Sequence, residues 1–114
     1  MAQIRVLYWK EIPVQVQAKD EKHSVSQQLD ERFQQGVDTI SMLDGSSGNE
    51  EYLAGWQWGE FSESEGSAED LAYNLTELIN STFPVDFVAR IRDMCSNGGR
   101  NPNPGALDHW FNAS

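Results

Sequence analysis

The sequence has no lysine or arginine between Phe33 and Ala89, although eleven aspartates and glutamates fall in that stretch. All eight basic residues lie outside it, and the formal net charge of the 114 residues is -10. Such a surface repels phosphate and anionic lipid, so we expect no binding to nucleic acid or to a membrane. The charge favours a basic protein partner. Two alternatives are imitation of nucleic acid toward a basic protein and a self-repelling surface that only prevents aggregation.

Soft metal ligands and long apolar runs are also scarce. Cys95 is the only cysteine, and His23 and His109 are the only histidines. A single cysteine excludes an internal disulfide, and this set disfavours a zinc site. No apolar run approaches the roughly 20 residues of a membrane helix, and no charged-then-apolar leader opens the sequence. We therefore expect a cytoplasmic protein with no metal and no cofactor.

The sequence offers no set of residues typical of a catalytic site. Cys95 falls at the end of a predicted helix, where the helix dipole disfavours a thiolate. Acid pairs such as Glu50 and Glu51 are adjacent in sequence, which gives no reason for a perturbed pKa. Gly98 and Gly99 follow a helix, whereas a phosphate-binding loop opens one. We expect no enzyme activity.

The first half of the sequence predicts two strands and a helix. Residues 4–8 are β-branched and aromatic, and residues 14–18 alternate apolar with polar side chains, as half-buried strands do. Pro13 lies between them and has no N–H to donate, so we expect a bend or bulge there. A helix is predicted to begin after Ser24, a capping residue. It ends near Gly45, which suits a left-handed stop.

The second half predicts one more strand and two more helices. Residues 52–61 are rich in aromatics and alternate in polarity, which indicates a strand, and residues 62–66 form an acidic loop. Ser67 caps the second helix, while Pro84 suits the start of a third helix that ends at Asn97. The predicted order is β-β-α-β-α-α. It describes a single two-layer α+β domain with a three-stranded antiparallel sheet and helices on one face.

Two features allow more than one interpretation. Gly36 lies inside the first predicted helix, where it either admits a close neighbour or is a tolerated weak spot. Residues 98–114 form a proline- and glycine-rich tail after a compact domain of residues 1–97. The apolar end of this tail either docks back on the domain or serves as a docking motif for another protein.

Aromatic side chains are the strongest candidates for a binding surface. Tryptophan is enriched in protein interfaces and at their hot spots, although packing in a core explains some members of the set equally well. The predicted interaction residues are Trp9, Trp56, Trp58, Trp110 and Phe111.

A run of residues near the start is distinctive. Residues 8–16 read Tyr-Trp-Lys-Glu-Ile-Pro-Val-Gln-Val, and with Arg32-Phe33, Asp38 and residues 52–56 they resemble the small bacterial "virulence factor" domain family. The resemblance spans residues 3–93 and leaves the C-terminal tail outside. It implies a domain with no agreed catalytic residues. The same domain also occurs fused to HEAT-like repeats, which scaffold protein contacts, so the resemblance favours binding over catalysis.

These observations favour a non-catalytic accessory or adaptor domain that presents an acidic, aromatic-bearing surface to another protein. The expected partner is a basic protein or an enzyme subunit encoded in the same operon. The rival hypothesis is a small-molecule-binding subunit or small enzyme of a metabolic complex. Its pocket would lie near Trp9 and use Arg32 and Asp38. The sequence sets no oligomeric state.

Overall fold

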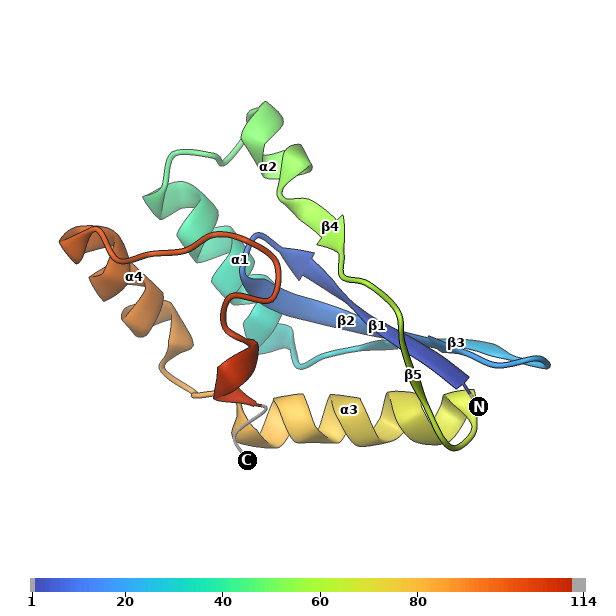
Figure 1. Cartoon of the computed structure of the whole chain (residues 1–114). Helices are drawn as coiled ribbons and strands as arrows, with labels where there is room; N and C mark the ends of the chain where they lie inside the picture. The colour runs from blue at the N-terminus through green and yellow to red at the C-terminus, as the bar shows by residue number, and fades with distance from the viewer. Residues whose placement is uncertain (1, 112–114) are drawn as a thin grey trace.

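The computed structural model describes residues 2–111, which form one antiparallel sheet with helices packed against it (Figure 1). The α+β class is confirmed, but the sheet has five strands where the sequence predicted three. The described elements follow one another as β1 (Ala2–Trp9), β2 (Ile12–Lys19), β3 (Ser24–Gln28), α1 (Glu31–Leu43), α2 (Glu50–Ala54), β4 (Trp56–Trp58), β5 (Ser62–Ser64), α3 (Ala68–Thr82), α4 (Phe87–Asn97) and the 3-10 turn η1 (Asp108–Trp110).

The long strand β1 organises the sheet, whose order is β3-β2-β1-β4 with β5 also paired to β1. The short strands β4 and β5 lie one after the other along the same edge of β1. β4 pairs with residues 7–9 and β5 with residues 2–4. Arg5 and Val6 therefore fall between the two pairings, where residues 59–61 join β4 to β5. Both short strands are edge strands, because each pairs with β1 alone.

The β1–β2 hairpin contains the irregularity that Pro13 predicted. The register shifts between Leu7 and Tyr8, and Tyr8 lies opposite Pro13. Beyond the shift, a two-residue turn joins the strands, and its first residue, Lys10, has a φ of 50°. A lysine rarely adopts this left-handed conformation. Here the Lys10 N–H donates to the carbonyl of Gly55 at 2.7 Å, which ties the turn to the end of α2.

The predicted start of the first helix is wrong. Residues 24–28 form strand β3, which pairs along β2 from Lys19 to Gln15. α1 begins only at Glu31, after Asp30. Ser24 carries a local capping signal, but the ladder to β2 satisfies the backbone of this segment instead. The C-terminal end is confirmed, because Gly45 follows the helix with a φ of 83°.

The segment predicted as one strand over residues 52–61 divides into helix and strand. Asn49 caps α2 by accepting a hydrogen bond from the Glu51 N–H at 2.9 Å, so residues 50–54 are helical. Only residues 56–58 pair with β1. The predicted acidic loop also contains a strand, β5, because Ser62, Glu63 and Ser64 pair with the first residues of β1.

Of the other two helices, α3 begins after Ser67 as predicted, whereas α4 begins at Phe87 and leaves Pro84 in the preceding turn. The Ser67 hydroxyl accepts a hydrogen bond from the Asp70 N–H at 3.1 Å and caps α3. α4 ends before Gly98, which is left-handed with a φ of 78°. α1 and α3 pack on β2, and α4 packs on α1. The ring of Phe87 on α4 fills the space above Gly36, where a Cβ would lie 2.5 Å from it.

Apolar side chains of the sheet and helices form one core. Val14, Val16 and Ala18 alternate along β2 with partly or fully exposed polar residues, and all three are buried. Polar side chains of β1 and β2 lie on the opposite face of the sheet. There the Nε of Arg5 on β1 donates to the side chain of Gln17 on β2 at 2.7 Å.

The C-terminal segment, residues 98–111, packs against its own domain. It leaves α4, crosses the turn between β1 and β2, and descends toward α3 (Figure 1). Leu107 and Phe111 are each 5 % exposed and belong to the core. The ring of Trp110 lies 5.4 Å from that of Phe83. The structure thus answers the question that the sequence left open about residues up to 111; residues 112–114 lie outside the described part.

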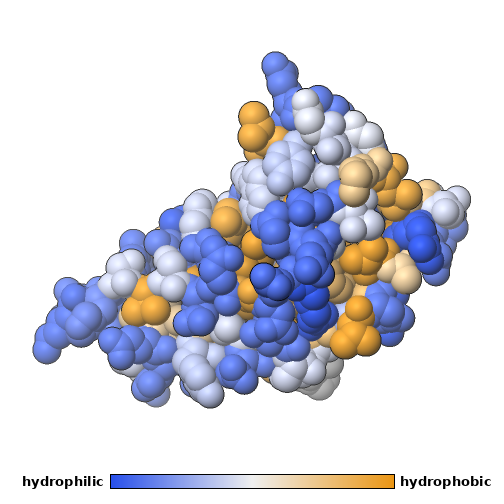
Figure 2. All heavy atoms as spheres, turned by 180° about the vertical axis from the view of Figure 1, so that it is seen from behind, coloured by the Kyte–Doolittle hydropathy of each residue, from blue (hydrophilic) through white to orange (hydrophobic). Residues whose placement is uncertain are grey.

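The tip of the β2–β3 hairpin projects from the body and is hydrophilic, while apolar residues on the rear face form separate patches (Figure 2). Asp20 holds the tip in place, because its carboxylate accepts hydrogen bonds from the N–H groups of Lys22, His23 and Ala68. These bonds, that from Ala68 foremost, lower the pKa of Asp20 to about 2. Within residues 2–111, no helix has the length and apolar character needed to cross a membrane.

Candidate functional site

The predicted interaction residues divide between core and surface. Trp9 is 0 % exposed, and its indole N–H donates to the carbonyl of Tyr52 at 2.9 Å. Phe111 is also buried. These two side chains cannot touch a partner in this conformation, so their assignment to an interface is corrected to the core. Trp56 and Trp110 are partly buried, and Trp58 is 39 % exposed.

The structure does not bring Arg32 and Asp38 together as a ligand pocket. The Arg32 guanidinium donates to the carbonyls of Asn80, Phe83 and Pro84, and so closes the C-terminal end of α3. Asp38 is exposed and accepts a hydrogen bond from Gln34 one turn earlier on α1. The Arg32 side chain is therefore occupied by a structural role.

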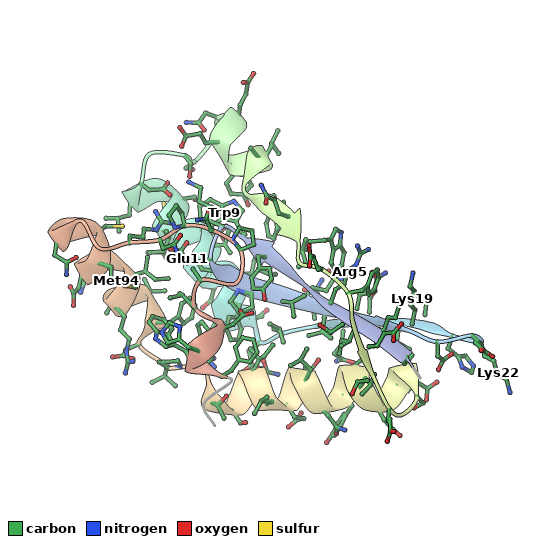
Figure 3. The ribbon with its side chains drawn as sticks, in the orientation of Figure 1. Arg5, Trp9, Glu11, Lys19, Lys22 and Met94 are labelled. Carbon is green, nitrogen blue, oxygen red and sulfur yellow. The ribbon has the colours of Figure 1, made fainter. Side chains whose placement is uncertain are left out.

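Four charged side chains meet where the C-terminal segment crosses the turn of the hairpin, and we call them the ion cluster: Lys10, Glu11, Asp44 and Arg100. Glu11 is 0 % exposed and lies beside Trp9 at the end of the hairpin (Figure 3). The Arg100 guanidinium donates two hydrogen bonds to the Glu11 carboxylate, at 2.7 and 2.8 Å. The third nitrogen of Arg100 donates to Asp44 at 2.9 Å, and Lys10 donates to the same Asp44 oxygen at 2.8 Å.

Each charged side chain of the ion cluster lies against one of opposite charge. Burial alone would raise the pKa of Asp44, but hydrogen bonds from Lys10, Ser46 and Arg100 outweigh it and hold the pKa below its usual range. The bond to Glu11 raises the pKa of Arg100. The effect of the ion cluster is to fasten the C-terminal segment to the hairpin.

A cleft of about 440 Å³ opens where β4 and β5 part along β1. Apolar side chains of β1, α3 and the C-terminal segment line it, among them Ile4, Leu75 and Phe111. Its polar lining includes the pair formed by Tyr8 and Asp108, in which the Tyr8 hydroxyl lies 2.9 and 2.8 Å from the two carboxylate oxygens. A cleft of this size matches those that hold small groups in other proteins.

The electrostatics of this pair reflect its burial. Burial, more than the hydrogen bond from Tyr8, sets the pKa of Asp108, which is raised. Burial and the neighbouring Asp108 charge also raise the pKa of Tyr8. The hydroxyl therefore stays protonated and donates a hydrogen bond to the Asp108 carboxylate. Within residues 2–111, no lysine or arginine forms a salt bridge with Asp108.

Residues 56–65, which comprise β4, β5, their link and Glu65, border the cleft and form what we call the acidic aromatic edge. Trp58, Glu60, Glu63 and Glu65 are exposed, and Phe61 is partly so. The Arg5 guanidinium carbon lies 4.0 Å from the centre of the Trp58 ring and 4.4 Å from that of Phe61. Arg5 thus fixes both rings by cation–π contacts. Lys19 lies 4.4 Å from the Phe61 ring and supports it in the same way.

Comparison with known proteins identifies the family. The family described as Virulence factor matches residues 7–91, which is most of the chain. The chain belongs to the Virulence factor family. This match confirms the resemblance drawn from the hairpin sequence. A search of curated proteins and a search of solved structures each found no match.

The Virulence factor match contains the turn of the β1–β2 hairpin, strand β2 and the acidic aromatic edge, but it leaves out residues 2–6 of β1 and the C-terminal segment. Arg100 of the ion cluster and Asp108 of the cleft therefore lie outside it. Sequence reasoning missed both residues. Arg100 is separated from Glu11 by 89 residues and Asp108 from Tyr8 by 100, and no local pattern links them. Within residues 2–111, no group of three or more His, Cys, Asp or Glu side chains is placed so that it could hold a metal ion.

Proposed function

We propose that the protein is a non-catalytic, cytoplasmic interaction domain that binds a basic segment of a partner protein through its acidic aromatic edge. The observation that carries this proposal is the exposed Trp58 ring held in place by Arg5, with carboxylates on the same edge. A ring fixed before binding loses little conformational entropy on association, which favours affinity.

Charge supports a basic partner. The acidic aromatic edge contributes Glu60, Glu63 and Glu65 and no lysine or arginine of its own, within a chain of net charge -10. Arg5 and Lys19 lie against the rings and are engaged there. The field of the whole molecule steers a positively charged segment toward it and raises the rate of encounter.

Two matched variants test the proposal by capture of proteins from native lysate. The edge variant combines Trp58→Ala, Glu63→Gln and Glu65→Gln. The control combines Tyr73→Ala, Glu69→Gln and Glu77→Gln on α3, which removes one exposed aromatic ring and two acids elsewhere. We expect one partner to be recovered by the native protein and by the control. Because truncating an interface tryptophan costs about 2 kcal/mol or more, its recovery by the edge variant should fall at least about thirtyfold.

Circular dichroism and thermal unfolding establish that both variants are folded before capture. Equal recovery by the edge variant, or no stoichiometric partner with the native protein at low or moderate salt, would contradict the proposal. The two salt conditions matter because contacts between exposed charges weaken as ionic strength rises.

A further inference from the structure

The cleft beside the acidic aromatic edge combines an apolar wall with a carboxylate. Ile4, Val6 and Leu75 supply the apolar side, and Asp108 lies in the lining with Glu60. Lysine and arginine side chains have the matching form, with an apolar stem and a cationic end.

The Asp108 carboxylate has acceptor positions that the Tyr8 hydroxyl does not fill. A tyrosine hydroxyl carries a single proton, so Tyr8 satisfies one of the four lone-pair positions of the carboxylate at a time. In the described part of the chain, no lysine or arginine pairs with Asp108. A partly buried carboxylate without a counter-ion is costly, and a cation that enters the cleft removes that cost.

The surroundings select the kind of ligand. Glu60 and Asp108 disfavour an anion. Arg5 also borders the cleft, but its guanidinium is stacked on Trp58 and Phe61 and bonded to Gln17. Gly59, Glu60 and Ser62 belong to the acidic aromatic edge as well as to the cleft, so a chain bound on that edge passes its mouth.

We infer that the cleft receives the lysine or arginine side chain of the partner segment bound at the acidic aromatic edge, with Asp108 as its counter-ion. This inference rests on the proposed function and names the residue type that the partner must place there. Tyr8 positions the Asp108 carboxylate by its hydrogen bond.

Single-residue probes test the cleft without the partner. The full chain, labelled with ¹⁵N, is titrated with N-acetyl-arginine amide and N-acetyl-lysine amide. N-acetyl-citrulline amide is the control, because it has the shape of the arginine probe without its charge. We expect the Gly59 and Gly105 amides, which border the cleft, to shift with at least one cationic probe at a Kd on the order of millimolar. They should not shift with citrulline.

Two variants complete the test. Asp108→Asn removes the charge and keeps an oxygen that accepts from Tyr8, so the protein should remain folded and lose at least about tenfold in affinity for the cationic probes. Glu77→Gln removes an exposed charge on α3 and should change nothing. Equal shifts with citrulline, no shift at Gly59 and Gly105 with either cation, or unchanged affinity in folded Asp108→Asn would each overturn the inference.

The titration tests the inference and the capture experiment tests the proposed function, so the two results distinguish which statement is wrong. If only the edge variant loses the partner and neither cationic probe binds the cleft, the inference is wrong and the proposed function stands. A cleft that binds the cations, together with equal capture by the edge variant, overturns the proposed function and leaves a cation site without that partner. If both experiments fail, both statements are wrong.

Discussion

Single residues in this domain gain their roles from distant parts of the chain. Arg32 stands in sequence beside the core residue Phe33, but its guanidinium closes the end of α3 through the carbonyls of Asn80 and Phe83. Trp9, the tryptophan of the distinctive hairpin sequence, is a core residue whose indole N–H donates to the carbonyl of Tyr52. The partners that each side chain meets in the fold, and not its residue type alone, decide which role it takes.

Gly36 gives a prediction at this scale. Alanine is the better helix former by about 1 kcal/mol, but its Cβ would lie 2.5 Å from the ring of Phe87. We expect Gly36→Ala to lower the free energy of unfolding by about 1–3 kcal/mol, because the overpacked ring must shift. Urea unfolding measures the change. Gln35→Ala, at an exposed position of the same helix, is the control and should have no cost. A Gly36→Ala protein as stable as the native one would show that the site is only a weak point.

Among the elements, those with strong local signals were predicted best. The alternation of β2, the Ser67 cap of α3 and the left-handed Gly98 after α4 each depend on neighbours in sequence. Strand β3 is defined by its ladder to β2, and β5 is three exposed residues held by β1. Such pairing over distance leaves little trace in a short polar segment. Asn49 was an available signal for α2, since its side chain caps that helix.

The candidate functional site also combines a feature with a local sequence signal and features that depend on pairing between distant residues. Trp58 could be named as an interaction candidate from its residue type, but the cleft depends on how β4 and β5 divide the edge of β1. It also depends on the C-terminal segment, which brings Asp108 to Tyr8. Neither arrangement has a local pattern in the sequence.

The C-terminal segment gives the prediction at the scale of elements. Arg100→Ala leaves Glu11 buried without a cation, and breaking a buried pair in this way costs about 3–5 kcal/mol. We expect a loss of this size in chemical unfolding. Arg92→Ala is the control, because Arg92 is exposed. The double variant Glu11→Leu with Arg100→Leu should recover much of the loss, since no charge is then buried alone.

The outcome also bears on residues 1–97, whose folding as a compact domain stays a prediction. If Arg100→Ala is as stable as Arg92→Ala, the ion cluster does not fasten the segment, and the shorter domain would fold without it. If the loss is found, a chain ending at residue 97 should be less stable still, because it also lacks Leu107 and Phe111 from the core.

At the scale of the whole molecule, many of the basic residues are engaged within the fold. Lys10 and Arg100 belong to the ion cluster, Arg32 bonds to carbonyls at the end of α3, and Arg5 lies against the rings of Trp58 and Phe61. The carboxylates of the acidic aromatic edge remain exposed. A chain of net charge -10 therefore presents an acidic surface with a fixed tryptophan, which fits recognition of a basic protein.

Site-specific photo-crosslinking in cells tests this claim most directly. The photoreactive residue p-benzoylphenylalanine replaces Trp58 in one protein and Tyr73, an exposed residue of α3, in another. We predict a discrete adduct with one basic protein at position 58 and none at position 73. No adduct at position 58, or the same adduct at both positions, would contradict the account.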